Sequence, residues 1–139
     1  MPSLRYSTVP LHRIVYTANR TVTQMWLYAN NLQGEVPLLL ADLVSLRSLS
    51  LGANRLTGAI PTTIWANMSQ LRYLSLAKNL LVGEIPASLG ELGTLTELRL
   101  HGNSLEGVVP TQLGELMMLQ VWQTPPLTWW TIVLSRTSL

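Results

Sequence analysis

The chain has 139 residues, enough for one domain, and contains no Cys, which excludes a disulfide framework, a thiolate metal site and a cysteine nucleophile. Hydrophobic residues make up 47% and charged residues 12% of the sequence, and this excludes a disordered charged tail because so much apolar surface favours burial. The formal net charge is +2, but residues 22–121 carry five basic and seven acidic side chains, so we expect no clustered cationic surface and no nucleic-acid partner.

A repeated pattern begins at residue 22. Four asparagines recur at separations of 24, 25 and 24 residues: Asn30, Asn54, Asn79 and Asn103. Apolar residues precede each of them at fixed offsets, and an apolar residue, a Gly and a Pro follow at fixed offsets. Self-similarity with this period predicts a repeat architecture in which neighbouring copies share one core.

The third copy indicates the shape of one coil. Leu74 and Leu76 lie at alternate positions, which predicts a short strand with its leucines on one buried face. Asn79 follows at a turn, where a carboxamide can bond backbone groups that the bend leaves unpaired. Apolar residues spaced by three over residues 87–92 predict a single 3₁₀ or helical turn on the outer side.

Four segments carry the signature of a known repeat class: Gly34-Glu35-Val36-Pro37, Gly58-Ala59-Ile60-Pro61, Gly83-Glu84-Ile85-Pro86 and Gly107-Val108-Val109-Pro110. Residues 22–121 therefore resemble the plant-specific leucine-rich repeat family, in particular a fragment of the ectodomain of a receptor-like kinase or receptor-like protein. The resemblance implies an α/β fold, a right-handed leucine-rich repeat solenoid. Short parallel β-strands are expected on its concave face, with loops and short 3₁₀ or helical turns on its convex face.

The resemblance also divides the chain into three parts. Residues 1–21 resemble a degenerate N-terminal cap lacking cysteines, residues 22–121 form about four repeats plus the start of a fifth, and residues 122–139 are a non-repeat tail. In the fifth copy Trp122 takes a strand leucine position, Thr124 takes the next, and Leu127 falls where Asn belongs. We interpret the tail as the mark of a truncated gene product or of a misread final exon, and we expect it to cover the last repeat.

Six residues on the expected concave face are candidate ligand contacts: Trp26, Tyr28, Tyr73, Glu97, Arg99 and His101. Large aromatics such as Trp26 and Tyr28 are enriched among interface anchors, although packing against the cap or against each other is the alternative. The polar residues of the fourth copy form either a recognition strip, with Arg99 contacting a carboxylate, or a solvated strand with an ion pair. We interpret Asn30, Asn54, Asn79 and Asn103 as a structural ladder inside the solenoid.

Enzymatic chemistry is not expected. A Ser-His-Glu set can be imagined from His101 and Glu97 with Ser75 or Ser50, but an open sheet offers neither an oxyanion hole nor a pocket. No phosphate-binding loop, kinase signature or metal-ligand spacing occurs in the sequence. We therefore expect no catalytic residue, no cofactor and no metal.

Two sequons, Asn19-Arg20-Thr21 and Asn67-Met68-Ser69, make Asn19 and Asn67 candidate N-glycosylation sites, with chance occurrence as the alternative. The late apolar run at residues 129–134 is far shorter than the roughly 20 residues that span a bilayer. The N-terminus also lacks an apolar segment of about 7–15 residues, so we expect neither a membrane segment nor a signal peptide in this chain. The family resemblance nevertheless implies an extracellular or plasma-membrane-associated location.

The resemblance implies a non-enzymatic module that binds a protein or peptide ligand, with a co-receptor ectodomain as a further partner, in signalling or defence perception. A secreted inhibitor of a cell-wall hydrolase such as polygalacturonase would use the same concave face and is an alternative. A truncated structural remnant with no ligand is the second alternative.

Overall fold

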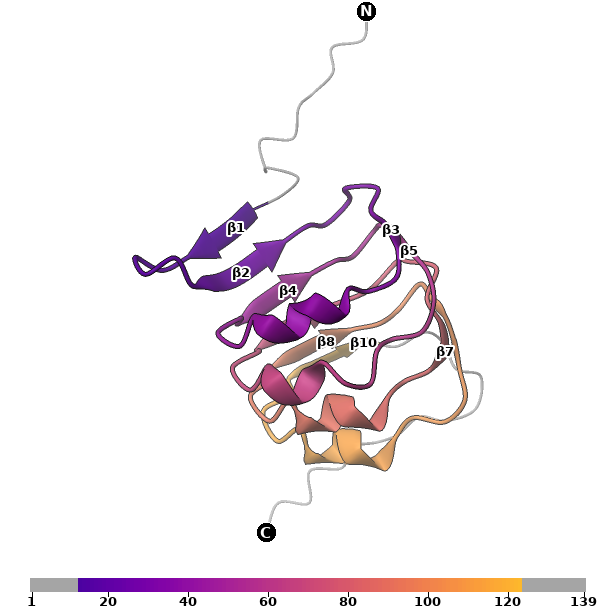
Figure 1. Ribbon diagram of the computed structural model, residues 1–139. Helices are drawn as coiled ribbons and strands as arrows, with labels where there is room; N and C mark the ends of the chain where they lie inside the picture. The colour runs from indigo at the N-terminus through magenta and orange to yellow at the C-terminus, as the bar shows by residue number, and fades with distance from the viewer. Residues whose placement is uncertain (1–12, 124–139) are drawn as a thin grey trace, which may run out of the picture.

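Short strands stacked along one axis form the inner layer of the molecule (Figure 1). The computed structural model describes residues 13–123. All neighbouring strands of the inner sheet run parallel except the first pair, β1 and β2, which is antiparallel. In spatial order the six strands are β1 (Arg13–Tyr16), β2 (Val22–Trp26), β4 (Ser48–Ser50), β6 (Tyr73–Ser75), β8 (Glu97–Arg99) and β10 (Val121–Gln123).

The register of the sheet places equivalent leucines side by side. Leu49 pairs with Leu74, and Leu74 pairs with Leu98, so the solenoid expected from the sequence is confirmed. At the C-terminal end of the sheet Trp122 pairs with Leu98 and so occupies a strand leucine position. The positions assigned to Thr124 and Leu127 lie outside the described residues.

Short 3₁₀ turns form the outer layer, opposite the sheet (Figure 1). They are η1 (Leu38–Asp42), η2 (Trp65–Asn67), η3 (Ala87–Glu91) and η4 (Thr111–Glu115). All but η2 begin directly after the Pro of the repeat, whose extended backbone precedes the turn. The second coil is one residue longer, and η2 begins later, after Ile64.

Two small parallel sheets connect the inner and outer layers. β3 (Gln33–Gly34) pairs with β5 (Arg55–Leu56), and β7 (Val82–Glu84) pairs with β9 (Ser104–Glu106). The glycines of these segments have positive φ, +88° at Gly34 and +78° at Gly83, a conformation that L side chains rarely adopt. This geometry explains why each copy needs a Gly shortly before its Pro.

Successive coils share one continuous hydrophobic core. Each fully buried Leu contributes roughly 1.5–3 kcal/mol relative to an exposed one. The core leucines lie between coils, so no single coil could bury them alone. Equivalent positions are buried alike in consecutive coils, both two residues before each strand and directly before each Pro: Leu46, Leu71, Leu95, Val36, Ile60 and Ile85.

The recurring asparagines join neighbouring coils through their carboxamides. Asn79 is only 6% exposed. Its Nδ2 donates to the carbonyl oxygens of Leu51 and Leu76, each at 3.0 Å, and its Oδ1 accepts from the N–H of Leu56 at 3.0 Å. Because these partners belong to two coils, one side chain satisfies backbone groups that would otherwise be buried and unpaired.

The same bonding recurs before and after Asn79. The Nδ2 of Asn103 donates to the carbonyl oxygens of two coils, and its Oδ1 accepts from the N–H of Leu81 at 3.1 Å. The Oδ1 of Asn54 accepts from the N–H of Asn30 at 2.9 Å, and the Nδ2 of Asn30 donates to the carbonyl of Tyr28 at 3.2 Å. The four residues therefore form a column of carboxamide–backbone contacts along the stack.

Candidate ligand-binding surface

An aromatic pair spans the inner face of the sheet, on the side opposite the strand leucines. The ring centroids of Trp26 and Tyr73 lie 5.1 Å apart, with their planes inclined by 41°. Trp26 belongs to β2 and Tyr73 to β6, so the rings meet across β4. A tilted arrangement at this distance is one of the favourable geometries for aromatic side chains.

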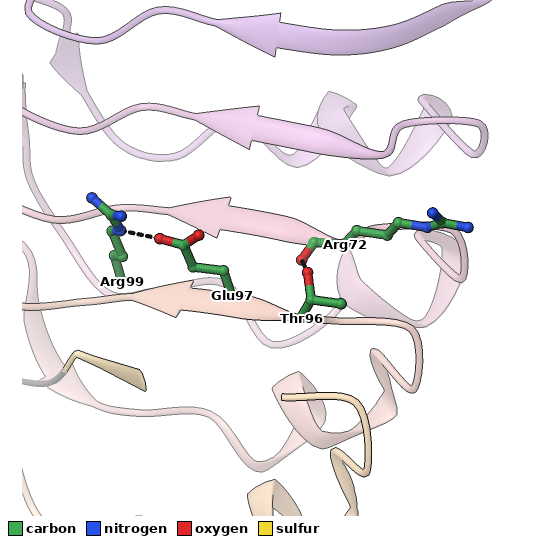
Figure 2. A network of polar contacts seen from close by, with 4 residues as sticks. All are labelled: Arg72, Thr96, Glu97 and Arg99. Carbon is green, nitrogen blue, oxygen red and sulfur yellow. Dashed lines mark hydrogen bonds and ion pairs between the residues drawn. The ribbon is translucent and has the colours of Figure 1, made fainter. Parts of the chain in front are cut away.

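Arg99 extends this contact by one further strand, β8. The Cζ of Arg99 lies 5.8 Å from the centre of the Tyr73 ring, within the range of a cation–π interaction. Its Nε donates to Oε1 of Glu97, and the two residues form an ion pair (Figure 2). The Arg99 side chain remains 41% exposed and that of Glu97 22% exposed, so both remain accessible to a ligand.

Gln24 is an additional member of this group that the sequence interpretation did not select. The indole Nε1 of Trp26 donates to Oε1 of Gln24 at 3.1 Å, which orients the ring. Its position two residues before Trp26, on the same face of β2, is the signal that could have identified it. We call the connected set the concave strip: Gln24, Trp26, Tyr73, Glu97 and Arg99.

Tyr28 and His101 lie outside the concave strip. Tyr28 is 50% exposed, and its ring lies over Gly52, 3.2 Å from where a Cβ would be. His101 is partly buried, and its Nδ1 is buried without a hydrogen-bond partner within residues 13–123. The structure thus brings together four of the six candidate contacts and leaves these two in the next row of the inner face, two residues after Trp26 and Arg99.

The inner face is less open than the alternating pattern indicates. Ser50 and Ser75 lie at strand positions that alternate with the buried leucines, yet each is only 3% exposed, and Ala77 is 5% exposed. These side chains are short, and the larger rings of Trp26 and Tyr73 meet above the strand that carries Ser50. Ser50, Ser75 and Ala77 therefore offer little surface to a ligand.

A side-chain contact also fixes the start of β8 beside the preceding coil. The Oγ1 of Thr96 donates to the backbone carbonyl of Arg72 at 2.8 Å (Figure 2). The Arg72 side chain points away from Arg99 in this view, so the two guanidinium groups do not share one site (Figure 2). Arg99 is therefore the cation that lies against the aromatic pair.

Both sequon asparagines are exposed. Asn67 is the last residue of η2, in the outer layer opposite the sheet, and Asn19 lies in the turn that joins β1 to β2. A glycan on Asn67 would leave the concave strip uncovered because the two lie on opposite layers.

Other types of site are absent from the described part of the chain. Residues 13–123 hold no cluster of three or more His, Asp or Glu side chains that could bind a metal ion. Within the same range, none of the helical segments is long and apolar enough to cross a membrane.

Comparisons with known proteins agree with this geometry. Residues 44–105 match the leucine rich repeat family. A chain in the crystal structure of the BIR3–SERK2 complex from Arabidopsis thaliana is 30% identical, with a TM-score of 0.78 over 89% of this chain and 69% of that chain. The BIR2 ectodomain from Arabidopsis thaliana is 32% identical, with a TM-score of 0.76 over 80% of this chain and 59% of that one.

A third similar structure is the Arabidopsis receptor kinase HAESA in complex with the peptide hormone IDA and the co-receptor SERK1. It is 38% identical, with a TM-score of 0.63 over 66% of this chain but only 16% of the HAESA chain. No curated protein sequence gives a significant match. The repeat, the solenoid and these similarities to plant receptor ectodomains lead to one conclusion: the chain belongs to the leucine-rich repeat family.

Proposed function

We propose that the chain is a non-enzymatic module, part of a plant receptor-like kinase or receptor-like protein ectodomain, that binds a protein or peptide ligand in signalling or defence perception. The ligand would lie on the concave strip and extend to the two residues beside it. The residues proposed to contact it are Trp26, Tyr28, Tyr73, Glu97, Arg99 and His101.

The observation that supports this proposal is the connected row of Trp26, Tyr73 and Arg99 on the inner face of the sheet. These side chains lie on the opposite side of the strands from the leucine core, so the coils do not need them in order to stack. Trp, Tyr and Arg are the residue types most enriched among the energetically dominant residues of interfaces. Their convergence across three coils therefore favours recognition over a purely structural role.

The chemistry of the concave strip also limits what would bind there. Arg99 presents donors in a planar fork that matches a carboxylate, and Glu97 already accepts from its Nε. An acidic group on the ligand would compete with Glu97 for the guanidinium, and an apolar side chain would pack beside Trp26 and Tyr73. We therefore propose a ligand with a carboxylate next to an apolar or aromatic side chain.

Similarity to receptor ectodomains supports the location and partners that we propose. HAESA was crystallised with a peptide hormone and a co-receptor, and we extend both partner types to this chain as proposals because it spans only 16% of the HAESA chain. We also propose an extracellular or plasma-membrane-associated location with N-glycans at Asn67 and Asn19, which are both exposed.

The proposal is tested by selecting ligands from a library of random linear peptides on the immobilised full chain. Enriched peptides are then titrated against the full chain and its Trp26→Ala variant, after circular dichroism has shown that the variant is folded. Leu80→Ala is the matched control, because Leu80 is an exposed apolar side chain outside the concave strip. We expect Trp26→Ala to weaken binding about tenfold or more, equivalent to ~1.4 kcal/mol, and Leu80→Ala to leave it unchanged.

Failure to enrich any peptide, or equal effects of the two substitutions, would contradict the proposed function. Inhibition of a fungal polygalacturonase by a chain that enriches no peptide would instead support the inhibitor alternative. The enzyme assay therefore accompanies the peptide selection.

A further inference from the structure

The hairpin formed by β1 and β2 continues the inner sheet by one strand on the N-terminal side of the first repeat (Figure 1). Its turn is closed by two backbone hydrogen bonds: the Thr17 N–H donates to the carbonyl of Thr21, and the Arg20 N–H donates to the carbonyl of Thr17, each at 2.9 Å. A side chain on the inner face of β1 is therefore held beside the concave strip by a hydrogen-bonded strand.

The register of the hairpin places Arg13 on the inner face. Ile14 pairs with Met25, whose side chain packs against the hydrophobic core. Arg13 pairs with Trp26, whose ring contacts Tyr73 on the other side of the sheet, the inner face. Directly opposed residues of an antiparallel pair point to the same face. Arg13 therefore lies next to Trp26 on the inner face, and it is exposed.

Arg13 pairs with none of the acidic side chains of the chain. All seven of these lie between positions 35 and 115, within the described residues, and the one ion pair in that range joins Arg99 to Glu97. Among residues 13–123, the Arg13 side chain also makes no hydrogen bond and no cation–π contact, whereas Arg99 lies over Tyr73. The Arg13 guanidinium is therefore available to an acidic group on a ligand.

The two arginines lie at opposite ends of the aromatic pair. Arg13 on β1 and Arg99 on β8 are four strand spacings apart in the sheet, with Trp26 and Tyr73 on strands between them. At about 4.8 Å for each spacing, the two backbones are separated by roughly 19 Å. An extended peptide advances about 3.4 Å per residue, and both arginine side chains are long, so acidic groups about four to six residues apart would reach both guanidinium groups.

We infer that Arg13 is a second acid-recognising residue of the ligand site, and that the ligand is an extended peptide with two acidic groups flanking an apolar or aromatic segment. This inference rests on the proposed function, because it concerns the ligand of the concave strip. One acidic group would satisfy only one arginine, so the pair selects ligands by the spacing of their negative charges. Charge complementarity of this kind contributes more to specificity than to affinity.

Charge removal at two matched arginines tests the inference. A library-selected peptide is titrated into the full chain and into its Arg13→Gln and Arg20→Gln variants, which remove the same charge from the same hairpin. Arg20 is exposed beside the turn that joins β1 to β2. We expect Arg13→Gln to weaken binding about threefold or more, the scale of an exposed charge pair, and Arg20→Gln to leave it unchanged. Equal effects of the two, with Trp26→Ala still weakening the same peptide, would overturn the inference and leave the proposed function standing.

Double-mutant cycles between the chain and the peptide locate each contact. Every Asp or Glu of the selected peptide is replaced in turn by Asn or Gln, and each peptide is titrated into the full chain, Arg13→Gln and Arg99→Gln. One acidic position is expected to couple to Arg13, and another, about four to six residues away, to Arg99. Coupling of no position to Arg13, or of one position to both arginines, would overturn the inference. If Trp26→Ala weakens no selected peptide, the proposed function fails and the inference fails with it.

Discussion

Trp26 and Tyr73 meet across β4, a strand to which neither belongs. The contact is made on the side of the sheet that faces away from the leucine core, so it adds stability without being needed for the coils to stack. Arg99 continues the row on the next strand. One set of residues thus links the surface of three coils, while the leucines and asparagines hold the interior.

Removing the two rings, singly and together, tests whether the contact between Trp26 and Tyr73 contributes to the free energy of unfolding. A double-mutant cycle with Trp26→Ala and Tyr73→Ala is expected to give a coupling free energy of about 1 kcal/mol, because tilted aromatic pairs gain this much beyond simple burial. Urea denaturation of the four proteins measures it. The Tyr28→Ala/Tyr73→Ala cycle is the control and should be additive, since the Tyr28 ring lies over Gly52. Additivity in both cycles would show that the rings do not interact.

The repeat period was sufficient to predict the stacked fold. Leu49, Leu74 and Leu98 lie in adjacent strands because each copy places its leucine at the same offset from its Asn, and parallel pairing then fixes the register. The burial of Trp65 does not follow from the repeat period. The second coil is one residue longer, so its outer turn begins later and buries Trp65 completely.

The candidate surface was only partly predictable. Alternation along each strand assigned Trp26, Tyr73 and Arg99 to one face, and they lie there. Their mutual contact depends on side-chain rotamers and on the small size of Ser50, neither of which follows from a two-residue period. For the same reason the near-complete burial of Ser50 and Ser75 was missed.

The outer layer offers a matched pair of glycines for measuring how tightly coils pack. Gly90→Ala is expected to destabilise the fold by about 1–3 kcal/mol, because its Cβ would collide with the backbone of Gln112 and packed structure would have to shift. Gly114→Ala, in the equivalent turn with open space around it, should change stability by less than about 1 kcal/mol. Thermal denaturation of both variants gives the comparison, and equal losses would contradict the close packing of η3 on η4.

The asparagine column predicts an unequal response to a single type of substitution. Asn79→Ala should lower the free energy of unfolding by roughly 2–5 kcal/mol, because several buried backbone groups lose their hydrogen-bond partner at once. Asn67→Ala, at an exposed site, should change it by less than about 0.5 kcal/mol. Urea titrations followed by circular dichroism measure both, and a small effect at Asn79 would mean that water or backbone shifts satisfy those groups equally well.

Glycosylation provides a prediction about location. When an added signal directs the full chain into the secretory pathway of plant cells, Asn67 is expected to carry an N-glycan because it is exposed in the outer layer. Intact-mass spectrometry before and after peptide N-glycosidase treatment detects it, and Asn67→Gln should remove it. An unmodified mass for the secreted chain would contradict the proposed glycans.

The most direct test of the account compares two arginines. Arg99 lies in the concave strip and Arg55 is exposed on β5, in the connecting layer. Calorimetric titration of a library-selected peptide into Arg99→Ala and Arg55→Ala should show affinity reduced about tenfold or more in the first, because charge-assisted hydrogen bonds contribute about 1.5–3 kcal/mol, and unchanged affinity in the second. Equal affinity for both variants would mean that ligands do not bind at the concave strip.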